Sequence, residues 1–351
     1  MRFRFAKINE NPPLSPFVKG GLNSPLSRGV RGVSPPLAKG GEGGFLKFSP
    51  DQSGGVALIL VVWVIVVLIA IVGEFSYSMR TEINITRNFK EDEQAYQLAL
   101  AGLEAAKAEI LTAKDLTKMY ADADGVIIFD REAEEAPVRE ADLGAGRYKY
   151  IITDEEGKLS LNTATLAQLK YIFKDSGVEG EDLDIIADSL FDWRDDNDLH
   201  LLNGAEEDYY QSLEVPYSAK DGPFDSVEEL LLVKGVTPEF FYGSKGGDEE
   251  KAYGGVSKYF TAAGSGVINL NTAPKVVLEA VTGSAAAENI IMQREKGPVT
   301  APAAGGKLSS DVFTIVSTGS NQDGTIKRSI KATLRKKENK LETLYWSDNV
   351  I

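Results

Sequence analysis

The stretch GGVALILVVWVIVVLIAIVGEFSYSMR, residues 54–80, decides how this chain is organised. It contains seventeen consecutive apolar residues, Val56–Val72, before the first acid, Glu74. At ~1.5 Å per helical residue this run reaches roughly 25 Å, slightly less than the ~30 Å hydrocarbon core of a bilayer. The run therefore predicts a membrane-embedded helix, and the rest of the chain must distinguish a signal peptide from a plain anchor or a more specialised segment.

The helical pattern continues beyond the apolar run. Apolar residues recur at steps near three and four as far as Ile110, charged residues lie between them, and Glu74–Ala101 contains no proline or glycine. We therefore predict a single helix over residues 56–111, roughly 80 Å long, whose last two-thirds are amphipathic. The alternative is a membrane anchor followed by a separate surface helix.

Charge differs on the two sides of the apolar run. Residues 1–55 are rich in Pro and Gly and carry eight Lys or Arg against three Asp or Glu, whereas the remainder carries 30 against 49. This asymmetry predicts a cytoplasmic N-terminus and an exported, acidic body. The composition of residues 1–55 predicts a leader that forms no core. Because the chain has no cysteine, the exported body must be stabilised by packing or by bound ions.

Beyond the long helix, strand-like and helical patterns alternate in large blocks. Strand-like runs occur at 125–130 and 146–154, and a β-hairpin with its turn at Asn321–Gly324 follows a mainly helical region. The predicted fold class is α+β, with a long N-terminal helix packed on a small antiparallel sheet that is interrupted by a large inserted all-α domain. We assign residues 112–157 and 286–351 to the sheet domain and residues 158–285 to the inserted domain.

The inserted region contains the tetrapeptide L-N-T-A twice, and each copy precedes apolar residues at helical spacing. Asn162 or Thr163 in the first copy, and Asn271 or Thr272 in the second, are predicted to cap the following helices. Between the copies, SVEELLLVKGVTPEFF has a serine cap and a stop at Gly235. Helix, glycine-containing turn and helix together are typical of a helix-hairpin-helix unit.

Helix-hairpin-helix units bind DNA phosphates in many proteins, so charge decides whether this one could. Residues 159–283 carry nine Lys or Arg and 23 Asp or Glu. A surface of that sign repels a polyanion, and we therefore predict that the chain does not bind nucleic acid.

The densest acidic cluster is DWRDDNDLHLLNGAEEDYY, residues 192–210. Its many side-chain oxygens suit Ca²⁺, which takes six to eight oxygen ligands, and no cysteine or paired histidine suggests zinc. The EF-hand template fails because no register places acids at its required positions with Gly sixth and Glu twelfth. We predict a structural Ca²⁺ site here, and a solvated acidic loop is the alternative.

Catalytic machinery is scarce in this sequence. His200 is the only histidine and lies among leucines, and no G-x-S-x-G, P-loop, H-E-x-x-H or nucleotide-binding glycine motif occurs in a suitable context. A membrane-anchored hydrolase would need such a constellation. We therefore predict that the protein is not an enzyme.

Several stretches resemble a known family. GGVALILVVWVIVVLIAIVGEF resembles the class III signal of type IV pilin-like proteins, which a prepilin peptidase cuts after a glycine. The blocks EDEQAYQLALAGLEAAKAE, DSLFDWRDDND, NGAEEDYYQSLEVPY, PFDSVEELLLVKGVTPE, INLNTAPKVVLEAV and TLYWSD are similar to the minor pseudopilin K family of the type II secretion system. The resemblance covers about residues 53–347.

The resemblance implies a pilin-like fold whose inserted domain has helix-hairpin-helix or SAM-like repeats. It implies cleavage between Gly55 and Val56, N-methylation of Val56, and a single-pass protein of the bacterial inner membrane with its bulk in the periplasm. It further implies that the protein joins minor pseudopilins I and J at the tip of the pseudopilus. There it would help to initiate pseudopilus assembly, with the major pseudopilin and an inner-membrane assembly platform, for the export of folded proteins across the outer membrane.

Two residue-level expectations follow from the resemblance. Most pilin-like chains carry glutamate as the fifth mature residue, but this position is Leu60 here, as in the K family. In the filament that glutamate is thought to pair with the neighbouring N-terminal ammonium, so a subunit with nothing ahead of it would bury the acid unpaired, at a cost of several kcal/mol. Calcium ions occur in the family's insertion, which implies ligands among Asp192, Asp195, Asn197, Glu206, Glu207 and Asp208.

The chain also departs from the family. A disulfide used in the helical domain of the family is absent here, and the leader is much longer than the usual short basic one, which puts the translation start in doubt. The alternative function is a membrane-anchored helix-hairpin-helix DNA-binding protein of the competence type, and the acidic charge argues against it.

Overall fold

The computed structural model describes residues 53–130, 137–245, 252–302 and 305–348, so most of the predicted leader lies outside the described residues. By compactness the chain divides into two units, residues 1–70 and residues 71–351. In the first unit the described part is the beginning of helix α1 (Ser53–Thr112). The prediction of one long N-terminal helix is therefore confirmed.

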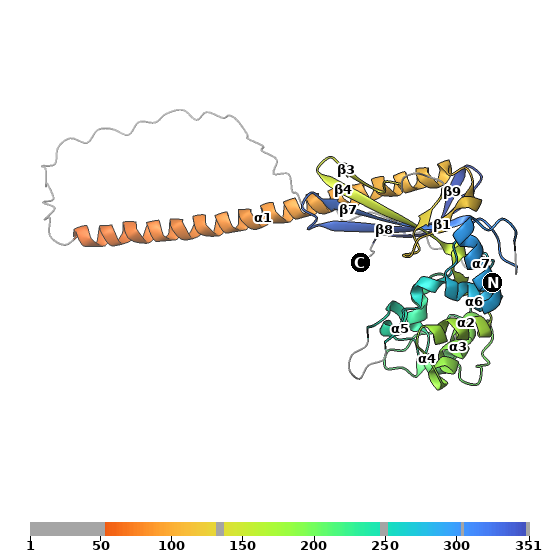
Figure 1. The fold of residues 1–351 in the computed structure, drawn as a ribbon. Helices are drawn as coiled ribbons and strands as arrows, with labels where there is room; N and C mark the ends of the chain where they lie inside the picture. The colour runs from red at the N-terminus through yellow and green to blue at the C-terminus, as the bar shows by residue number, and fades with distance from the viewer. Residues whose placement is uncertain (1–52, 131–136, 246–251, 303–304, 349–351) are drawn as a thin grey trace, which may run out of the picture. The chain divides into compact units, whose positions relative to one another are not determined.

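The second unit contains a five-stranded antiparallel sheet in the order β3-β4-β7-β8-β9 (Figure 1). Its strands are β3 (Glu140–Leu143), β4 (Gly146–Asp154), β7 (Val312–Asn321), β8 (Lys327–Lys337) and β9 (Lys340–Ser347). β4 has the bounds that its alternating pattern predicts, with Tyr150 and Ile152 on the buried face. The predicted hairpin is also confirmed, since the Asn321 backbone N–H donates to Ile326 O at its turn.

The last turns of α1 pack on one face of this sheet. Leu103, Ala106 and Ile110 of the helix form a core with residues of β4, β7 and β8, namely Ile152, Phe313, Ile315, Ile330, Ala332 and Leu334. Two glycines permit the close approach. A Cβ on Gly319 of β7 would meet the backbone of Ala95 and Ala99, and one on Gly102 of α1 would meet Ser317. Small residues at both surfaces therefore allow the helix to lie directly against the strands.

Short elements connect α1 to the sheet. They are the 3-10 helix η1 (Leu116–Lys118) and the paired strands β1 (Tyr120–Ala121) and β2 (Ile127–Ile128). β2 occupies only the middle of the strand predicted at 125–130. Glu109 of α1 holds the chain around β2 to the helix. Its carboxylate accepts hydrogen bonds from Arg139 (2.6 Å) and from the Tyr150 hydroxyl (2.9 Å).

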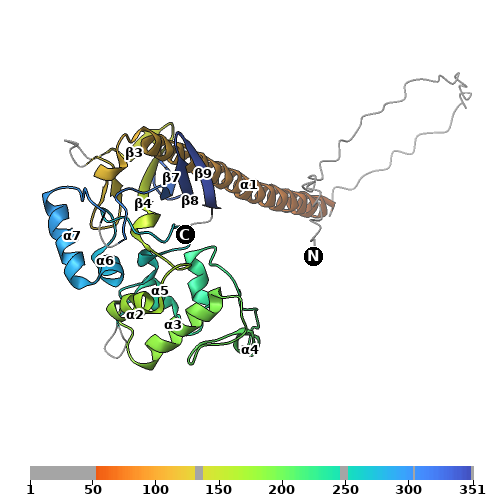
Figure 2. The same cartoon turned by 90° about the vertical axis from the view of Figure 1, so that its right-hand side faces the viewer.

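The chain between β4 and β7 is mainly helical and has its own hydrophobic core. Its α-helices are α2 (Leu166–Asp175), α3 (Glu181–Arg194), α4 (Glu207–Gln211), α5 (Pro238–Tyr242), α6 (Lys275–Thr282) and α7 (Ser284–Lys296). Two 3-10 helices, η3 (Val227–Leu232) and η4 (Ser257–Tyr259), lie among them. Figure 2 shows α2 beside both α3 and α6.

Two details of the inserted region differ from the prediction. It is not all-α, because β5 (Leu159–Ser160) and β6 (Phe260–Thr261) pair in parallel inside it. The helical run also continues to Lys296 rather than stopping near Gly283, because Gly283 ends α6 and at once begins α7. The glycine has φ +84° and can therefore serve as the junction between two helices as well as a stop.

The predicted helix caps of the L-N-T-A copies are wrong. Thr165, one residue beyond the first copy, caps α2, since its Oγ1 accepts from Gln168 N. α6 begins after Pro274, without a side-chain cap. The two asparagines bind distant backbone instead, because they lie in turns that precede the helices. The serine cap is partly confirmed, since Ser226 precedes η3 and its N–H donates to Glu229 Oε1 at 3.0 Å.

A buried polar junction joins the sheet to the inserted region. It includes the 3-10 helix η2 (Glu155–Gly157), which directly follows β4. The Asp154 carboxylate accepts hydrogen bonds from Thr272 Oγ1 at 2.5 Å and Ser310 Oγ at 2.6 Å, and burial raises its pKa to about 6. Glu156 accepts from Asp311 N and pairs with Lys307. The chain passes from the sheet to the inserted region after β4 and returns to the sheet before β7. Both connections are thus held by the short segment 154–156.

Candidate functional site

The predicted acidic cluster forms the end of α3, the loop after it and the beginning of α4. Two buried carboxylates of α3 hold the loop in place. Asp192 Oδ2 accepts from Leu201 N at 3.1 Å and from Ala205 N at 3.0 Å, and Asp188 Oδ2 accepts from Asn203 Nδ2 at 3.0 Å. A Cβ on Gly204 would collide with Asp192, so glycine is required at that position. The loop is therefore built around two carboxylates, of which Asp192 was a predicted ligand and Asp188 was not.

Glu206 is the most unusual residue of the cluster. Its side chain is only 3% exposed, and neither carboxylate oxygen has a hydrogen-bond partner among the described residues. Burial, together with the negative charges of Asp192, Asp195, Asp221 and Asp198, raises the pKa of Glu206 to about 7. A buried, unpaired carboxylate next to other carboxylates is unfavourable, and a bound cation would relieve it.

The other predicted ligands are already engaged. Asp195 Oδ1 accepts from Asn197 Nδ2 at 2.7 Å, so these two side chains satisfy each other. Glu207 Oε2 accepts from Ala219 N at 2.8 Å, and Asp208 lies exposed in the first turn of α4. Among the residues that the structure describes, no three Asp, Glu or His side chains converge as a ready metal-ligand set. The structure thus brings Asp192, Asp195 and Glu206 into one electrostatic neighbourhood, whereas the Glu207 carboxylate is held by the Ala219 N–H and Asp208 is exposed.

Sequence reasoning missed two acidic residues of this neighbourhood. Asp188 lies one helical turn before Asp192 and holds the loop in the same way. Asp221 lies outside the quoted acidic stretch, yet burial and the charges of Asp198, Glu207 and Asp195 raise its pKa. Its φ of +48° is unusual for a residue with a Cβ. The Asp-Gly dipeptide at 221–222 signals a turn, but no local pattern connects it with Glu206.

Aromatic side chains and one arginine complete the frame of the loop. Trp193 and Tyr210 are buried and meet edge to face, with ring centroids 5.1 Å apart, as expected for core aromatics. Arg194 directs its hydrogen bonds to backbone, although its charge also acts on Asp195. Its guanidinium donates to Leu161 O and Ala164 O and lies over the Phe191 ring. His200 is exposed, and its Nδ1 lies 3.0 Å from Leu201 O.

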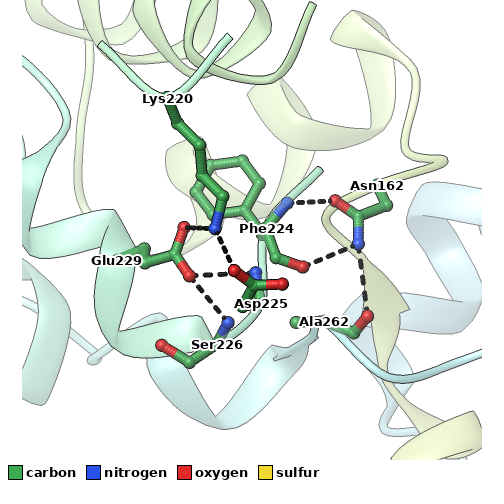
Figure 3. A network of polar contacts seen from close by, with 7 residues as sticks. All are labelled: Asn162, Lys220, Phe224, Asp225, Ser226, Glu229 and Ala262. Carbon is green, nitrogen blue, oxygen red and sulfur yellow. Dashed lines mark hydrogen bonds and ion pairs between the residues drawn. The ribbon is translucent and has the colours of Figure 1, made fainter. Parts of the chain in front are cut away.

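A second polar network lies at the C-terminal end of the acidic segment, residues 195–221 (Figure 3). Asn162 Oδ1 accepts from Phe224 N at 2.7 Å, and its Nδ2 donates to Phe224 O and Ala262 O. Beside this pair, Lys220 Nζ bridges Asp225 and Glu229, at 2.6 Å and 2.8 Å. The chain that follows the acidic segment is therefore held by Asn162, which precedes α2, and by Glu229 of η3.

The predicted processing residues lie in the first unit. Gly55, Val56 and Leu60 are part of α1, and the side chains of Val56 and Leu60 are 67% and 62% exposed. Within the described residues, one helix is long and apolar enough to cross a membrane, and it contains all three positions. Cleavage and methylation at this end remain predictions.

Three comparisons with known proteins agree. A family model described as type II secretion system protein K matches residues 151–242, which include the acidic cluster. Type II secretion system protein K of Aeromonas hydrophila is 26% identical over 219 residues, covering 54% of this chain. The chain spans only 61% of that relative's length.

The fold also matches a chain of a solved complex. That structure is the GspK-GspI-GspJ complex of the type 2 secretion system from enterotoxigenic Escherichia coli. The match has a TM-score of 0.54 at 17% identity and covers 78% of this chain and 100% of the other. At this identity the likeness concerns the fold alone. The matching domain at 151–242, the related protein K and this fold lead to one conclusion: over these parts the chain is similar to protein K of the type II secretion system, a secretion component rather than an enzyme.

Proposed function

We propose that this protein is a minor pseudopilin that caps the tip of the type II secretion pseudopilus and helps to start its assembly. The observation that carries the proposal is the combination of a long apolar helix, a small antiparallel sheet and a large helical region between β4 and β7. A region of this size would be hard to repeat along a tightly packed filament, whereas a terminal position leaves room for it. Minor pseudopilins I and J are the proposed immediate partners, since the matching solved fold comes from a complex with GspI and GspJ.

Leu60 supports the tip position on physical grounds. An internal subunit would use an acid at this position to pair with the ammonium of the subunit ahead. A terminal subunit has no such neighbour, and a buried unpaired carboxylate in an apolar environment costs several kcal/mol. Leucine at the fifth mature position is compatible with the end of a filament and unfavourable in its middle.

The proposed maturation begins at the cytoplasmic face of the inner membrane. Prepilin peptidase would cut between Gly55 and Val56 and methylate the new terminus, with the basic leader inside and the acidic body in the periplasm. The assembly platform would then move the subunit from the membrane into the pseudopilus, followed by the major pseudopilin, during export of folded proteins.

We further propose that the acidic segment binds structural calcium. The donor set is made of carboxylate and amide oxygens, which Ca²⁺ prefers, and the buried, unpartnered Glu206 indicates that a positive charge is missing. Asp192, Asp195, Asn197 and Glu206 are the favoured ligands, and Asp195 and Asn197 would give up their mutual hydrogen bond to bind the ion. Asp221 joins them because its charge acts on Glu206. Glu207 and Asp208 would have to leave their present hydrogen bonds to take part. The ion would link the end of α3 to α4.

Three experiments test the proposed function. N-terminal sequencing of the protein from a strain with its prepilin peptidase should give methylated Val56, and an intact chain or a cut beyond Val72 would contradict the proposal. Co-purification with the I and J pseudopilins from the same bacterium should yield a ternary complex. Leu60→Glu should leave that complex intact but reduce secretion. Wild-type secretion by Leu60→Glu would refute the argument for the tip.

DNA binding is the alternative function, because the inserted region contains a helix-hairpin-helix arrangement, and it can be tested directly. η3, the turn at Gly235 and α5 follow the order of such a unit, and we propose that the region descends from repeats of this kind. Its strong negative charge argues against retained DNA binding. A gel shift at low salt, where phosphate contacts are strongest, should show none.

A further inference from the structure

The two L-N-T-A copies adopt the same backbone turn. Ala164 N donates to Ser160 O at 2.9 Å in the first copy, and Ala273 N donates to Asn269 O at 3.0 Å in the second. Each turn leads into a pair of helices, α2 and α3 in the first case and α6 and α7 in the second. The shared letters therefore correspond to a shared local structure.

An arginine from the end of the second helix holds each turn. Arg194 in the last turn of α3 donates to Leu161 O at 2.5 Å and to Ala164 O at 2.7 Å. Arg294 near the end of α7 donates to Leu270 O at 2.5 Å and to Ala273 O at 2.7 Å. The two carbonyls occupy equivalent places in the two tetrapeptides, so the same contact is made twice.

The asparagine of each copy makes a second repeated contact. Asn162 pairs with both backbone groups of Phe224, accepting from its N–H at 2.7 Å and donating to its carbonyl at 3.0 Å (Figure 3). Asn271 pairs with Val299 in the same manner, at 2.8 Å and 3.3 Å. Both partners directly follow a Gly-Pro dipeptide. Turn, arginine and Gly-Pro segment thus define two structurally equivalent units.

The two units differ in the length of the chain between the arginine and the Gly-Pro dipeptide. The second unit has only two residues there, 295–296, whereas the first has the 27 residues 195–221. Those 27 residues include eight acids and one lysine. They also contain every candidate calcium ligand except Asp192, which lies at the end of α3. The acidic segment is therefore an insertion at one point of a repeated framework.

We propose that residues 195–221 are a calcium-binding insertion in the first of two equivalent units, and that Arg194 and Asn162 are positioning residues that hold its two ends. This inference rests on the proposed calcium site. Arg194 fixes the backbone directly before Asp195, and Asn162 fixes Phe224, three residues after Asp221. With both ends held, the carboxylates of the insertion stay close together despite their mutual repulsion, and less chain must be ordered when the ion binds.

The second unit supplies a matched control. Arg194→Lys and Arg294→Lys each keep the positive charge but lose the planar fork that reaches two carbonyls at once. In the full-length protein in detergent, calcium affinity is measured by titration calorimetry and unfolding by thermal melting without metal. Arg194→Lys should weaken calcium binding by about ten-fold, as expected for an outer-sphere positioning residue. Arg294→Lys should lower the melting temperature comparably and leave calcium affinity within about two-fold of wild type, since no acidic segment follows it.

Amide hydrogen exchange in metal-free protein separates this inference from the calcium site itself. Arg194→Lys should accelerate exchange in the segment 195–204, and Arg294→Lys should not. If wild type binds no calcium, the calcium site is wrong, and the exchange result alone decides whether Arg194 positions the insertion. Equal losses of calcium affinity in both variants, or unchanged exchange in Arg194→Lys, would overturn the positioning role.

A second pair of variants covers the case in which Arg194→Lys does not fold. Asn162→Asp and Asn271→Asp keep the oxygen that accepts from the backbone but remove the Nδ2 donor. Asn162→Asp should weaken calcium binding and accelerate exchange near residues 219–221, whereas Asn271→Asp should change neither. The same effect in both variants would contradict the inference.

Discussion

Replacing Glu206 by glutamine should stabilise the protein in the absence of calcium, although it changes a buried polar residue. The glutamate is 3% exposed, and neither oxygen has a partner among the described residues. Leaving a buried polar group unsatisfied costs about 1–3 kcal/mol, and a charged group costs more. Glutamine removes the charge at nearly constant volume. We therefore expect a gain of about 2 kcal/mol at pH 7.5 in a calcium chelator, read as a higher melting temperature.

The stability difference between Glu206→Gln and wild type should depend on pH. Because the folded-state pKa of Glu206 is raised to about 7 from 4.5, its neutral form is favoured in the folded protein. The associated stability is fully present below about pH 4.5 and is lost as the pH rises through 7. The advantage of Glu206→Gln should therefore appear at pH 7.5 and disappear near pH 4.5.

Calcium should reverse the order of the two proteins. At a calcium concentration 100 times its Kd, the wild type gains about 2.7 kcal/mol from binding, whereas Glu206→Gln loses a ligand and gains much less. Glu214→Gln is the control, because Glu214 is exposed in the same segment and its replacement should change stability by less than about 0.5 kcal/mol. A Glu206→Gln protein that melts below wild type at pH 7.5 without calcium would refute the reasoning. So would a stabilisation that is the same at both pH values.

Three further changes test the packing of α1 on the sheet and the junction between the sheet and the inserted region, each by thermal or denaturant unfolding. Gly319→Ala should cost about 1–3 kcal/mol, because the added methyl meets the backbone of α1 at Ala95; wild-type stability would show that the helix does not approach β7 so closely. Asp154→Ala should cost about 3 kcal/mol, because it leaves the buried hydroxyl groups of Thr272 and Ser310 without their acceptor. Arg139→Ala should cost about 2 kcal/mol by removing the partner of Glu109, and a value near zero would place this pair among weak surface ion pairs.

Local patterns were sufficient for elements whose partners lie nearby in the chain. The long helix follows from apolar spacing without interruption by proline or glycine, and β4 follows from strict alternation over Gly146–Asp154. The β7–β8 hairpin follows from turn chemistry at Asn321–Gly324. In each case the physical signal, a periodicity or a turn preference, acts over fewer than about ten residues and is visible directly in the sequence.

The candidate site was only partly predictable for the same reason. The acidic segment could be recognised by composition, and Asp192 and Glu206 were among the predicted ligands. Composition could not show that Glu206 is buried without a partner or that Asp221 lies in its electrostatic neighbourhood. It also suggested Glu207 and Asp208, whose hydrogen bonds lie elsewhere. Burial and electrostatic neighbourhood depend on the packing of whole elements, and local sequence does not specify them.

By itself the sequence determined the apolar helix, the acidic body, the strands β4, β7 and β8 and the two L-N-T-A segments, because each depends on neighbouring residues. Only the tertiary structure decided what those segments do. Asn162 and Asn271 do not cap the helices that follow them but bind backbone at Phe224 and Val299, and Arg194 reaches back to Leu161. These contacts join residues separated by about 28–62 positions in the sequence. Only the packing of the helices brings such residues within hydrogen-bond distance of each other.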